Sequence, residues 1–385
     1  MNHKALPNRP LRVIHIITDL NDGGAEAVLY RLCTTDLSNQ HQVISLMDQG
    51  KYGALLSSSG IPVYCINFKR NLASFFGLFK LWKLIRQLQP DVVQTWLYHA
   101  DFLGGITARL AGVRNLCWGI RNTTMVAGKS KRLTRVIAKL CAWLSHFVPR
   151  HIICCANKAA EDHQKLGYAA KKLVVISNGY DFSQFRPNYD AGLALRRIWQ
   201  VGDDCFLLGM VGRYDPQKDH RNLLAALAEF KSQGSISFRC VLVGKGLTSE
   251  NAALQEDLHK YALHDSVILL GQRLDIPVVM NALDVHVLSS AYGEGFPNVL
   301  AEAMACGTPC ITTDVGDAAQ IVAEHGWLVS PNDPSALAKA LQDAWQARQD
   351  SPTWQVRRSA CHQHIVDHFN IENTVEAFRK VWQED

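Results

Sequence analysis

The stretch LRVIHIITDLNDGGAE, residues 11–26, predicts how the chain folds. Residues 11–18 form a continuous apolar run, which is typical of a strand buried on both faces of a parallel sheet. Gly23 and Gly24 then predict a tight turn where the backbone can approach a ligand closely, and Glu26 opens a helix. A strand followed by a helix is the repeating unit of an α/β protein.

The same unit recurs along the chain of 385 residues. Apolar runs alternate with helical segments at 41–47, 61–67, 91–96, 151–156 and 172–178, then at 206–212, 238–244, 266–271, 285–290 and 309–314. Two such series predict two doubly wound, Rossmann-like domains with ligands at the carboxyl ends of their strands. We expect an N-terminal domain over 1–185 and a C-terminal domain over 186–370, with a last helix, about 371–385, packing back onto the first.

Composition indicates a globular protein, with 48% hydrophobic and 19% charged residues. The 11 cysteines include no Cys-x-x-Cys pair and mostly lie in apolar runs, as reduced thiols of a cytosolic protein do. The N-terminus has no signal-peptide pattern, and no apolar window is long enough to span a membrane. The sequence therefore predicts a cytoplasmic protein.

Charge is distributed unevenly. Residues 1–185 hold 23 Lys and Arg against 10 Asp and Glu, whereas residues 186–385 hold 17 against 25. Two helical segments, 72–88 and 129–147, carry many of the cations. In the second, large apolar side chains fall on one helical face, and Lys131, Arg132, Arg135 and Lys139 fall on the other. In the first, Phe75, Phe76, Phe79 and Trp82 should face outward beside cations. This pattern predicts peripheral binding of the N-terminal domain to an anionic membrane surface.

A second informative stretch is YGEGFPNVLAE, residues 292–302. Pro297 suits the first turn of a helix, so Glu294 should lie in the preceding loop and Glu302 more than one turn into the helix. The backbone N–H groups and dipole at a helix start attract anions, most often phosphate. The alternative is an ordinary helix start beside two solvated glutamates.

Polar side chains follow several predicted strands. Arg213 and Lys218 come after 206–212, where a guanidinium and an ammonium suit a pyrophosphate. His99 and Asp101 follow 91–96, and Arg121 and Asn122 end another strand. Arg273, in GQRLDI, follows 266–271. Taken singly, each could be a solvated loop residue.

Together these motifs resemble the family-four retaining glycosyltransferases. The resemblance rests on Glu294 and Glu302 within EGFPNVLAE, GGAE at 23–26, GR at 212–213 with Lys218 after it, and SNGYDFSQF at 177–185. It implies the GT-B fold, in which two Rossmann-like domains face each other across a cleft.

The resemblance also implies roles. Glu302 would hold the ribose hydroxyls of a nucleotide, Glu294 would lie against the donor sugar, and Arg213 and Lys218 would neutralise the diphosphate. His99 would lie close to the sugar. The remaining donor-binding residues are Gly23, Gly24, Arg273, Gly295, Phe296, Asn298 and Val299, while Asp101, Arg121 and Asn122 would lie on the acceptor side. Pro297 has no N–H to donate.

The chain contains no Asp-x-Asp pair, so no metal and no cofactor are expected. The predicted function is transfer of a hexose-type sugar, with retention, from a UDP-sugar to a lipid-linked glycan at the inner face of the cell membrane. A nucleic-acid partner is not expected. Two alternatives stay open: a sugar-nucleotide epimerase of the same fold, and a non-catalytic subunit that activates a partner enzyme.

Overall fold

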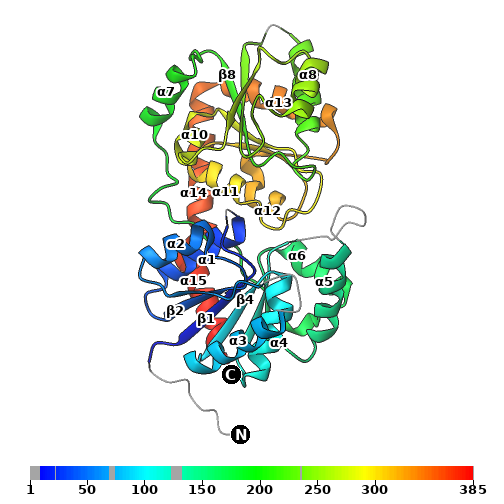
Figure 1. Ribbon diagram of the computed structural model, residues 1–385. Coiled ribbons are helices and arrows are strands. Elements are labelled where there is room, and N and C mark those ends of the chain that lie inside the picture. Colours follow the sequence, from blue (N-terminus) through cyan, green and yellow to red (C-terminus); the bar gives the residue numbers. More distant parts are fainter. Residues whose placement is uncertain (1–8, 22, 69–73, 123–131, 235, 385) are drawn as a thin grey trace. The chain divides into compact units, whose positions relative to one another are not determined.

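A computed structural model describes residues 9–21, 23–68, 74–122, 132–234 and 236–384, except the side chains of residues 74 and 75 (Figure 1). Among the residues discussed above, Phe75 and Lys131 therefore lie outside the described side chains. The chain divides into two compact units. The first comprises Met1–Gly179 together with Ile371–Asp385, and the second is Tyr180–Asn370.

The first unit contains a seven-stranded parallel sheet in the order β3-β2-β1-β4-β5-β6-β7. Its apolar strands need cover on both faces, and the helices that connect parallel strands supply it. The strands are β1 (Arg12–Ile17), β2 (Gln40–Ser45), β3 (Val63–Cys65), β4 (Val92–Trp96), β5 (Leu116–Ile120), β6 (His151–Cys154) and β7 (Leu173–Val175). The helices are α1 (Gly24–Thr35), α2 (Gly50–Ser58), α3 (Ser74–Leu88), a π-helical segment (Ala100–Gly104), α4 (Gly105–Leu110), α5 (Arg132–Leu144), α6 (Asn157–Leu166), a 3₁₀ turn (Ala170–Lys172) and α15 (Ile371–Gln383).

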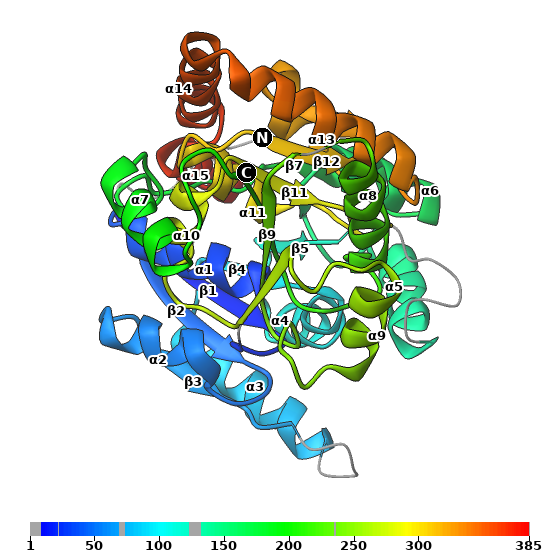
Figure 2. The same ribbon diagram turned by 90° about the horizontal axis from the view of Figure 1, so that it is seen from above.

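The second unit repeats this architecture with six parallel strands in the order β10-β9-β8-β11-β12-β13. The strands are β8 (Phe206–Val211), β9 (Phe238–Val243), β10 (Val267–Gly271), β11 (Val285–Leu288), β12 (Cys310–Thr313) and β13 (Trp327–Val329). The helices are α7 (Tyr189–Ile198), α8 (His220–Ser232), α9 (Ala252–Lys260), α10 (Ile276–Ala282), α11 (Asn298–Ala305), α12 (Ala318–Val322), a 3₁₀ turn (Ala323–His325), α13 (Pro334–Gln349) and α14 (Ser351–His368). Helices α8 and α13 lie side by side in this unit (Figure 2). The three-residue strand β13 was not predicted from the sequence, because it is too short to give a recognisable apolar run.

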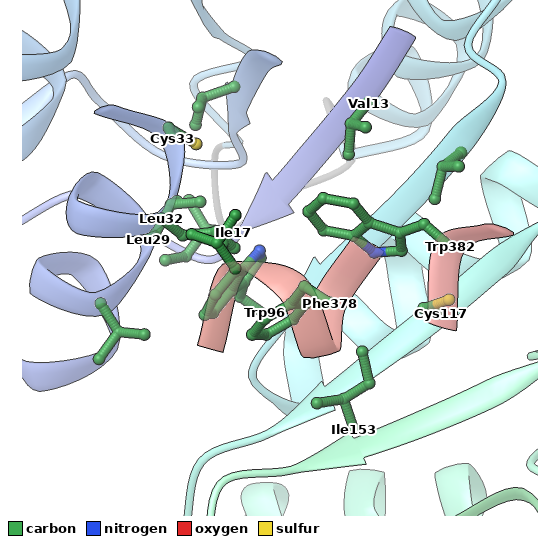
Figure 3. Packing of buried hydrophobic residues seen from close by; sticks show 14 of the residues in the cluster. Val13, Ile17, Leu29, Leu32, Cys33, Trp96, Cys117, Ile153, Phe378 and Trp382 are labelled. Carbon is green, nitrogen blue, oxygen red and sulfur yellow. The ribbon is translucent and has the colours of Figure 1, made fainter. Parts of the chain in front are cut away.

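The C-terminal helix α15 completes the core of the first unit. Phe378 and Trp382 lie among apolar side chains of the sheet and α1 (Figure 3). Both rings are fully buried. Polar contacts fix the same helix, since Arg379 donates to Asp36 Oδ1 at 2.9 Å through Nε and Asn115 Nδ2 donates to the carbonyl of Trp382 at 2.7 Å. Residues at the end of the chain are therefore structural members of its first domain.

Helix α5 and the turn that follows it expose several large apolar side chains. Five of them form an exposed ridge, called here the α5 apolar ridge: Leu133 (66% exposed), Val136 (54%), Leu140 (42%), Trp143 (66%) and Phe147 (69%). The opposite side, with Ala138, Cys141, Ala142 and Ser145, is buried. Small side chains let the helix backbone approach the rest of the domain closely, so the larger apolar side chains of this helix remain on its outer side.

Helix α3 presents the side that was expected. Leu81 and Ile85 are buried, whereas Phe76 and Phe79 are exposed. The Phe79 and Trp82 rings stack with centroids 5.8 Å apart, and the Arg86 guanidinium lies 5.2 Å from the Trp82 ring. Within the part of the chain that the structure describes, no helix combines the length and apolar character required to cross a bilayer.

Candidate active site

Each sheet has one point where the strand order reverses, between β1 and β4 in the first unit and between β8 and β11 in the second. Ligands of open α/β sheets bind outside the carboxyl ends of the strands at such a point. The segments after these four strands contain most of the residues singled out from the sequence: Gly23, Gly24, His99, Asp101, Arg213, Lys218 and Glu294.

In the second unit, Lys218 and Glu294 form an ion pair across the reversal point. Lys218 Nζ lies 2.7 Å from Glu294 Oε1, and the two side chains are only 12% and 10% exposed. Ser290 Oγ donates to the same carboxylate oxygen at 2.6 Å, and the Ser290 carbonyl accepts from Thr313 Oγ1 at 2.6 Å. The carboxylate is thus held from two sides. A nearly buried pair of this kind keeps its geometry because neither charge can be left alone at low cost.

Arg213 lies at the start of the loop after β8 and is far more accessible than Lys218. Its side chain is 58% exposed, and Nε donates to Asp215 Oδ2 at 3.1 Å. A second contact joins Arg213 to Gln217 Oε1 at 3.4 Å. Exposed pairs contribute little free energy, so an anionic ligand can draw the guanidinium away from Asp215.

The loop carrying Glu294 packs closely against the turn before α12. Gly316 has a φ of +67°, and a Cβ at this position would collide with the carbonyl oxygens of Glu294 and Gly295. The Asp317 N–H donates to the Gly295 carbonyl at 3.0 Å. The position of Glu294 therefore depends on a glycine in another segment.

Helix α11 begins at Asn298, with Pro297 as the residue preceding it rather than in its first turn as predicted. Asn298 Oδ1 accepts from the Tyr180 hydroxyl at 2.5 Å. Phe296 is buried, and its ring lies 5.3 Å from that of Phe369. Val299 follows in the first turn, where backbone N–H groups have no acceptor inside the helix. The start of α11 is thus fixed in place and can offer these groups to an anion.

Glu302 lies on α11 and is half-buried. Burial, with the Glu302 charge as a second cause, raises the pKa of the Cys306 thiol to about 12. Arg273 lies elsewhere, at the end of the edge strand β10, two positions from β8 in the sheet. Its Nε and Nη2 donate to the two Asp275 carboxylate oxygens at 2.8 and 2.5 Å. The structure therefore gives Arg273 a partner in its own loop.

In the first unit, Gly23 precedes α1 and Gly24 is its first residue. The Glu26 side chain folds back towards this turn. Its carboxylate lies so close to Gly23 that a Cβ at this position would collide with it. Glu26 is only 7% exposed. Gly23 thus makes room for a buried carboxylate beside the turn. This contact explains why a glycine is required at position 23 even without a bound ligand.

His99 is half-buried and directly precedes the π-helical segment after β4. Leu97, two residues earlier, has a φ of +73°, a conformation that is rare for a residue with a branched side chain. Its N–H donates to the Gly119 carbonyl at 3.0 Å. Strained backbone and π-helical turns are concentrated at functional sites, which agrees with a role for this segment.

Asp101 was placed on the acceptor side from the sequence, and the structure does not expose it. Its side chain is fully buried and accepts from Thr95 Oγ1 at 2.5 Å and from the Gly119 N–H at 3.2 Å. Burial raises the pKa of the Asp101 carboxyl to about 7. In this structure Asp101 links β4 to β5 and lies too deep to contact an acceptor.

Arg121 and Asn122 follow β5. The Arg121 guanidinium lies 4.2 Å from the Trp96 ring, and Nη1 donates to Asn178 Oδ1 at 2.9 Å. Burial lowers the pKa of this guanidinium. Asn122, the next residue, is exposed.

A possible metal-ligand cluster, His15, Cys33 and His41, lies buried in the first unit. His15 Nε2 is 2.9 Å from His41 Nδ1, and Trp96 Nε1 donates to His15 Nδ1 at 3.2 Å. His41 Nε2 lies 3.1 Å from Asp36 Oδ2. Because these nitrogen atoms already face partners, the cluster is better suited to joining β1, β2 and α1 than to holding an ion.

Sequence reasoning missed Ser290 and Gly316. Ser290 was visible as a hydroxyl at a strand end, and Gly316 as a glycine shortly after another strand, but neither pattern shows what it contacts. Ser290 donates to the Glu294 carboxylate, and Gly316 leaves room for the carbonyl oxygens of Glu294 and Gly295.

Comparison with known proteins identifies the family. A profile described as "Glycosyltransferase Family 4" matches residues 22–184. A second, described as "Glycosyl transferases group 1", matches residues 205–347. The chain belongs to the family-four glycosyltransferases.

Two curated relatives are bacterial glycosyltransferases whose names include diphosphoundecaprenol-linked acceptors. One is the Escherichia coli UDP-Gal:alpha-D-GlcNAc-diphosphoundecaprenol alpha-1,3-galactosyltransferase, 29% identical over 331 residues, which cover 84% of this chain and 82% of that protein. Another is the Campylobacter jejuni N,N'-diacetylbacillosaminyl-diphospho-undecaprenol alpha-1,3-N-acetylgalactosaminyltransferase, 25% identical, covering 71% of this chain and 73% of that protein.

Solved structures confirm the predicted fold class. Anabaena Alr3699/HepE in complex with UDP superposes with a TM-score of 0.84 at 22% identity, covering 96% of this chain and 99% of the other. A sucrose-phosphate synthase from Thermosynechococcus elongatus gives a TM-score of 0.77 at 19% identity, covering 97% and 98%. Family-four glycosyltransferases of this kind have the GT-B architecture of two Rossmann-like domains, and this chain shares it.

Proposed function

We propose that this glycosyltransferase moves a hexose-type sugar, with retention of configuration and without a metal, from a UDP-sugar to a lipid-linked diphosphate glycan. The observation that carries the proposal is the Lys218–Glu294 pair at the β8/β11 reversal point, with Arg213 on the same loop. The curated relatives support the acceptor class, because two of them carry diphosphoundecaprenol acceptors in their names.

The proposed chemistry follows from the leaving group. A nucleoside diphosphate leaves with negative charge, so cationic groups aimed at it lower the barrier most. Lys218 and Arg213 would supply that charge, and the start of α11 would add backbone N–H groups. Glu294 would contact the sugar, Glu302 would accept from the ribose hydroxyls, and His99 would lie close to the sugar. The β-phosphate would take the proton of the acceptor hydroxyl in a front-face substitution.

The test is a donor panel. Purified protein is incubated with several nucleotide sugars and an undecaprenyl-diphosphate-linked acceptor sugar, and release of nucleoside diphosphate is measured with the acceptor present and absent. UDP release that depends on the acceptor, together with an α-linked product by NMR, supports the proposal. A changed sugar without an acceptor-linked product would indicate the epimerase, and no turnover with any donor would favour the non-catalytic subunit.

Chelation gives a prediction about the metal. Activity should be unchanged in excess EDTA, because Arg213 and Lys218 would supply the positive charge that a divalent ion supplies in other transferases. Initial rates of UDP release with EDTA, with Mg²⁺ and with Mn²⁺ measure this. Loss of activity with EDTA that either ion restores would contradict it.

Substitutions of Glu302 and Glu294 should affect different quantities, the UDP affinity and kcat respectively. Glu302→Ala should weaken UDP binding by roughly 1.5–3 kcal/mol, the usual contribution of a hydrogen bond to a charged group. Glu294→Gln should mainly lower kcat, since the sugar changes charge in the transition state. Calorimetry with UDP and steady-state kinetics distinguish them, with the exposed Glu324→Ala as the control. Equal UDP affinity for wild type and Glu302→Ala would remove Glu302 from the proposed site.

We further propose that the first unit binds the anionic inner face of the membrane, where a lipid-linked acceptor lies. The α5 apolar ridge supports this more directly than the cations alone, since exposed apolar side chains of this number are costly in water. Arg132 and Lys139 lie exposed on the same helix, and Phe76 and Phe79 lie exposed on α3. Aromatic and cationic side chains mixed in this way suit the boundary between lipid headgroups and acyl chains.

Flotation with vesicles containing anionic lipid tests this surface. Wild type should float, Leu140→Ser/Trp143→Ser should float less at every salt concentration, and Arg132→Glu/Lys139→Glu should lose the salt-sensitive part of binding. Leu274→Ser, at an exposed leucine of the second unit, is the control and should behave as wild type. Wild-type protein that stays unbound at low salt would refute the membrane surface.

A further inference from the structure

Strands β8 and β11, at the reversal point of the second unit, are paired over only two residue pairs. Their backbone ladder pairs Leu208 with Val285 and Gly209 with His286, and then ends. Val211 lies beyond the last pair, where its N–H would otherwise face the widening gap. The His286 side chain fills that place, because the Val211 N–H donates to His286 Nε2 at 3.3 Å.

The imidazole is suited to this task only in its neutral form. His286 is fully buried, and burial, followed by the nearby Lys218 charge, lowers its pKa to about 3. Nε2 therefore keeps its lone pair at neutral pH, and the proton resides on Nδ1. Among the residues that the structure describes, Nδ1 has no hydrogen-bond partner. A buried polar atom left in this way costs stability, so its retention calls for an explanation other than stability.

The far end of the loop after β8 is tied to the same strand end. Ser289 Oγ, just past β11, lies 3.0 Å from the carbonyl oxygens of both Lys218 and Asp219. The Ala291 N–H donates to the Gln217 carbonyl at 2.8 Å. Asp219 has a φ of +47°, a left-handed conformation that non-glycine residues hold only when neighbouring groups enforce it.

The loop of residues 212–219 carries both Arg213 and Lys218. His286 in β11 holds the residue before the loop, and Ser289, just past β11, holds the last two residues of the loop. We propose that His286 and Ser289 are positioning residues of the donor site, which hold the two ends of this loop and so fix where it presents Arg213 and where Lys218 meets Glu294. The proposal rests on the donor site proposed above. Neither side chain would contact the sugar nucleotide itself; each acts through the backbone of the loop.

Paired variants separate positioning from packing. His286→Leu keeps an apolar side chain of similar size and removes the acceptor, whereas His286→Gln keeps an acceptor near the place of Nε2. Ser289→Ala removes the hydroxyl. Cys240→Ala is the control for lost core packing, because Cys240 is fully buried in β9, on the other side of β8 from His286. Thermal unfolding is recorded for each variant, and UDP affinity is measured by calorimetry at a temperature where all are folded.

His286→Leu and Ser289→Ala should each bind UDP about tenfold more weakly, and His286→Gln should recover affinity to within about threefold of wild type. Cys240→Ala should lose thermal stability without losing UDP affinity. Wild-type affinity in His286→Leu, or an equal loss in Cys240→Ala, would show that His286 serves packing alone and would overturn the proposal. Wild-type protein that fails to bind UDP would instead overturn the donor site, and the positioning role with it.

Discussion

Lys218→Met is expected to lower kcat by about a thousandfold, because it removes a preorganised charge aimed at the leaving diphosphate. It should also destabilise the second unit. Lys218 and Glu294 are 12% and 10% exposed, so removing the ammonium leaves a nearly buried carboxylate without its partner. Breaking a buried pair in this way costs roughly 3–5 kcal/mol. One substitution should therefore change both catalysis and folding.

A double variant separates the two effects. In Lys218→Met/Glu294→Gln the amide carries no charge and can still accept from Ser290 Oγ, which donates to Glu294 in the wild type. Its free energy of unfolding should return most of the way to wild type, while kcat stays low. Urea denaturation and steady-state kinetics measure these quantities. Recovery of activity together with stability would mean that Lys218 acts only as the structural partner of Glu294.

Gly316→Ala is expected to weaken UDP binding by about a hundredfold although residue 316 touches no proposed ligand. A left-handed residue with a side chain is strained by about 1 kcal/mol or more. The larger effect is steric, because the new methyl group would collide with the carbonyl oxygens of Glu294 and Gly295. These carbonyl groups belong to the backbone and cannot rotate away as a flexible side chain can. The loop bearing Glu294 must therefore move.

Gly271→Ala is the matched control. Its φ of +61° resembles the +67° of Gly316, but its Cβ would meet only a methyl group of Thr248, at 3.3 Å. It should lose similar stability from backbone strain and keep UDP affinity. Calorimetry and thermal unfolding of the two variants side by side decide the matter. If both lose affinity equally, backbone strain rather than displacement of Glu294 is responsible.

Much of the fold could be predicted because parallel sheets follow a simple pattern. Apolar runs such as residues 206–212 and 285–290 mark strands, and polar residues immediately after them must lie at one edge of the sheet. Arg213 and Lys218 were found by this rule, and Glu294 by its place just before a predicted helix start. The structure adds that Lys218 and Glu294 meet, which their separation in the sequence does not show.

Three features could not be predicted, each because it depends on contacts between distant segments. Asp101 follows a strand, yet its carboxylate turns inward to Thr95 and Gly119. Helix α5 buries its small residues and exposes its large ones, which reverses the usual relation between size and burial. His286 was read as part of an apolar strand, although its ring replaces a missing backbone partner.

The place of α15 in the first unit affects how this protein folds during translation. The first unit takes Phe378 and Trp382 into its core, yet these residues leave the ribosome after the whole of Tyr180–Asn370. During translation the first sheet must therefore remain with part of its apolar face uncovered while an entire second domain is made and folds. Nascent chains with uncovered apolar surface are prone to aggregation and are bound by chaperones. Truncation of the chain before residue 371 would thus remove part of the core of the first unit, although the rest of that unit lies before residue 180.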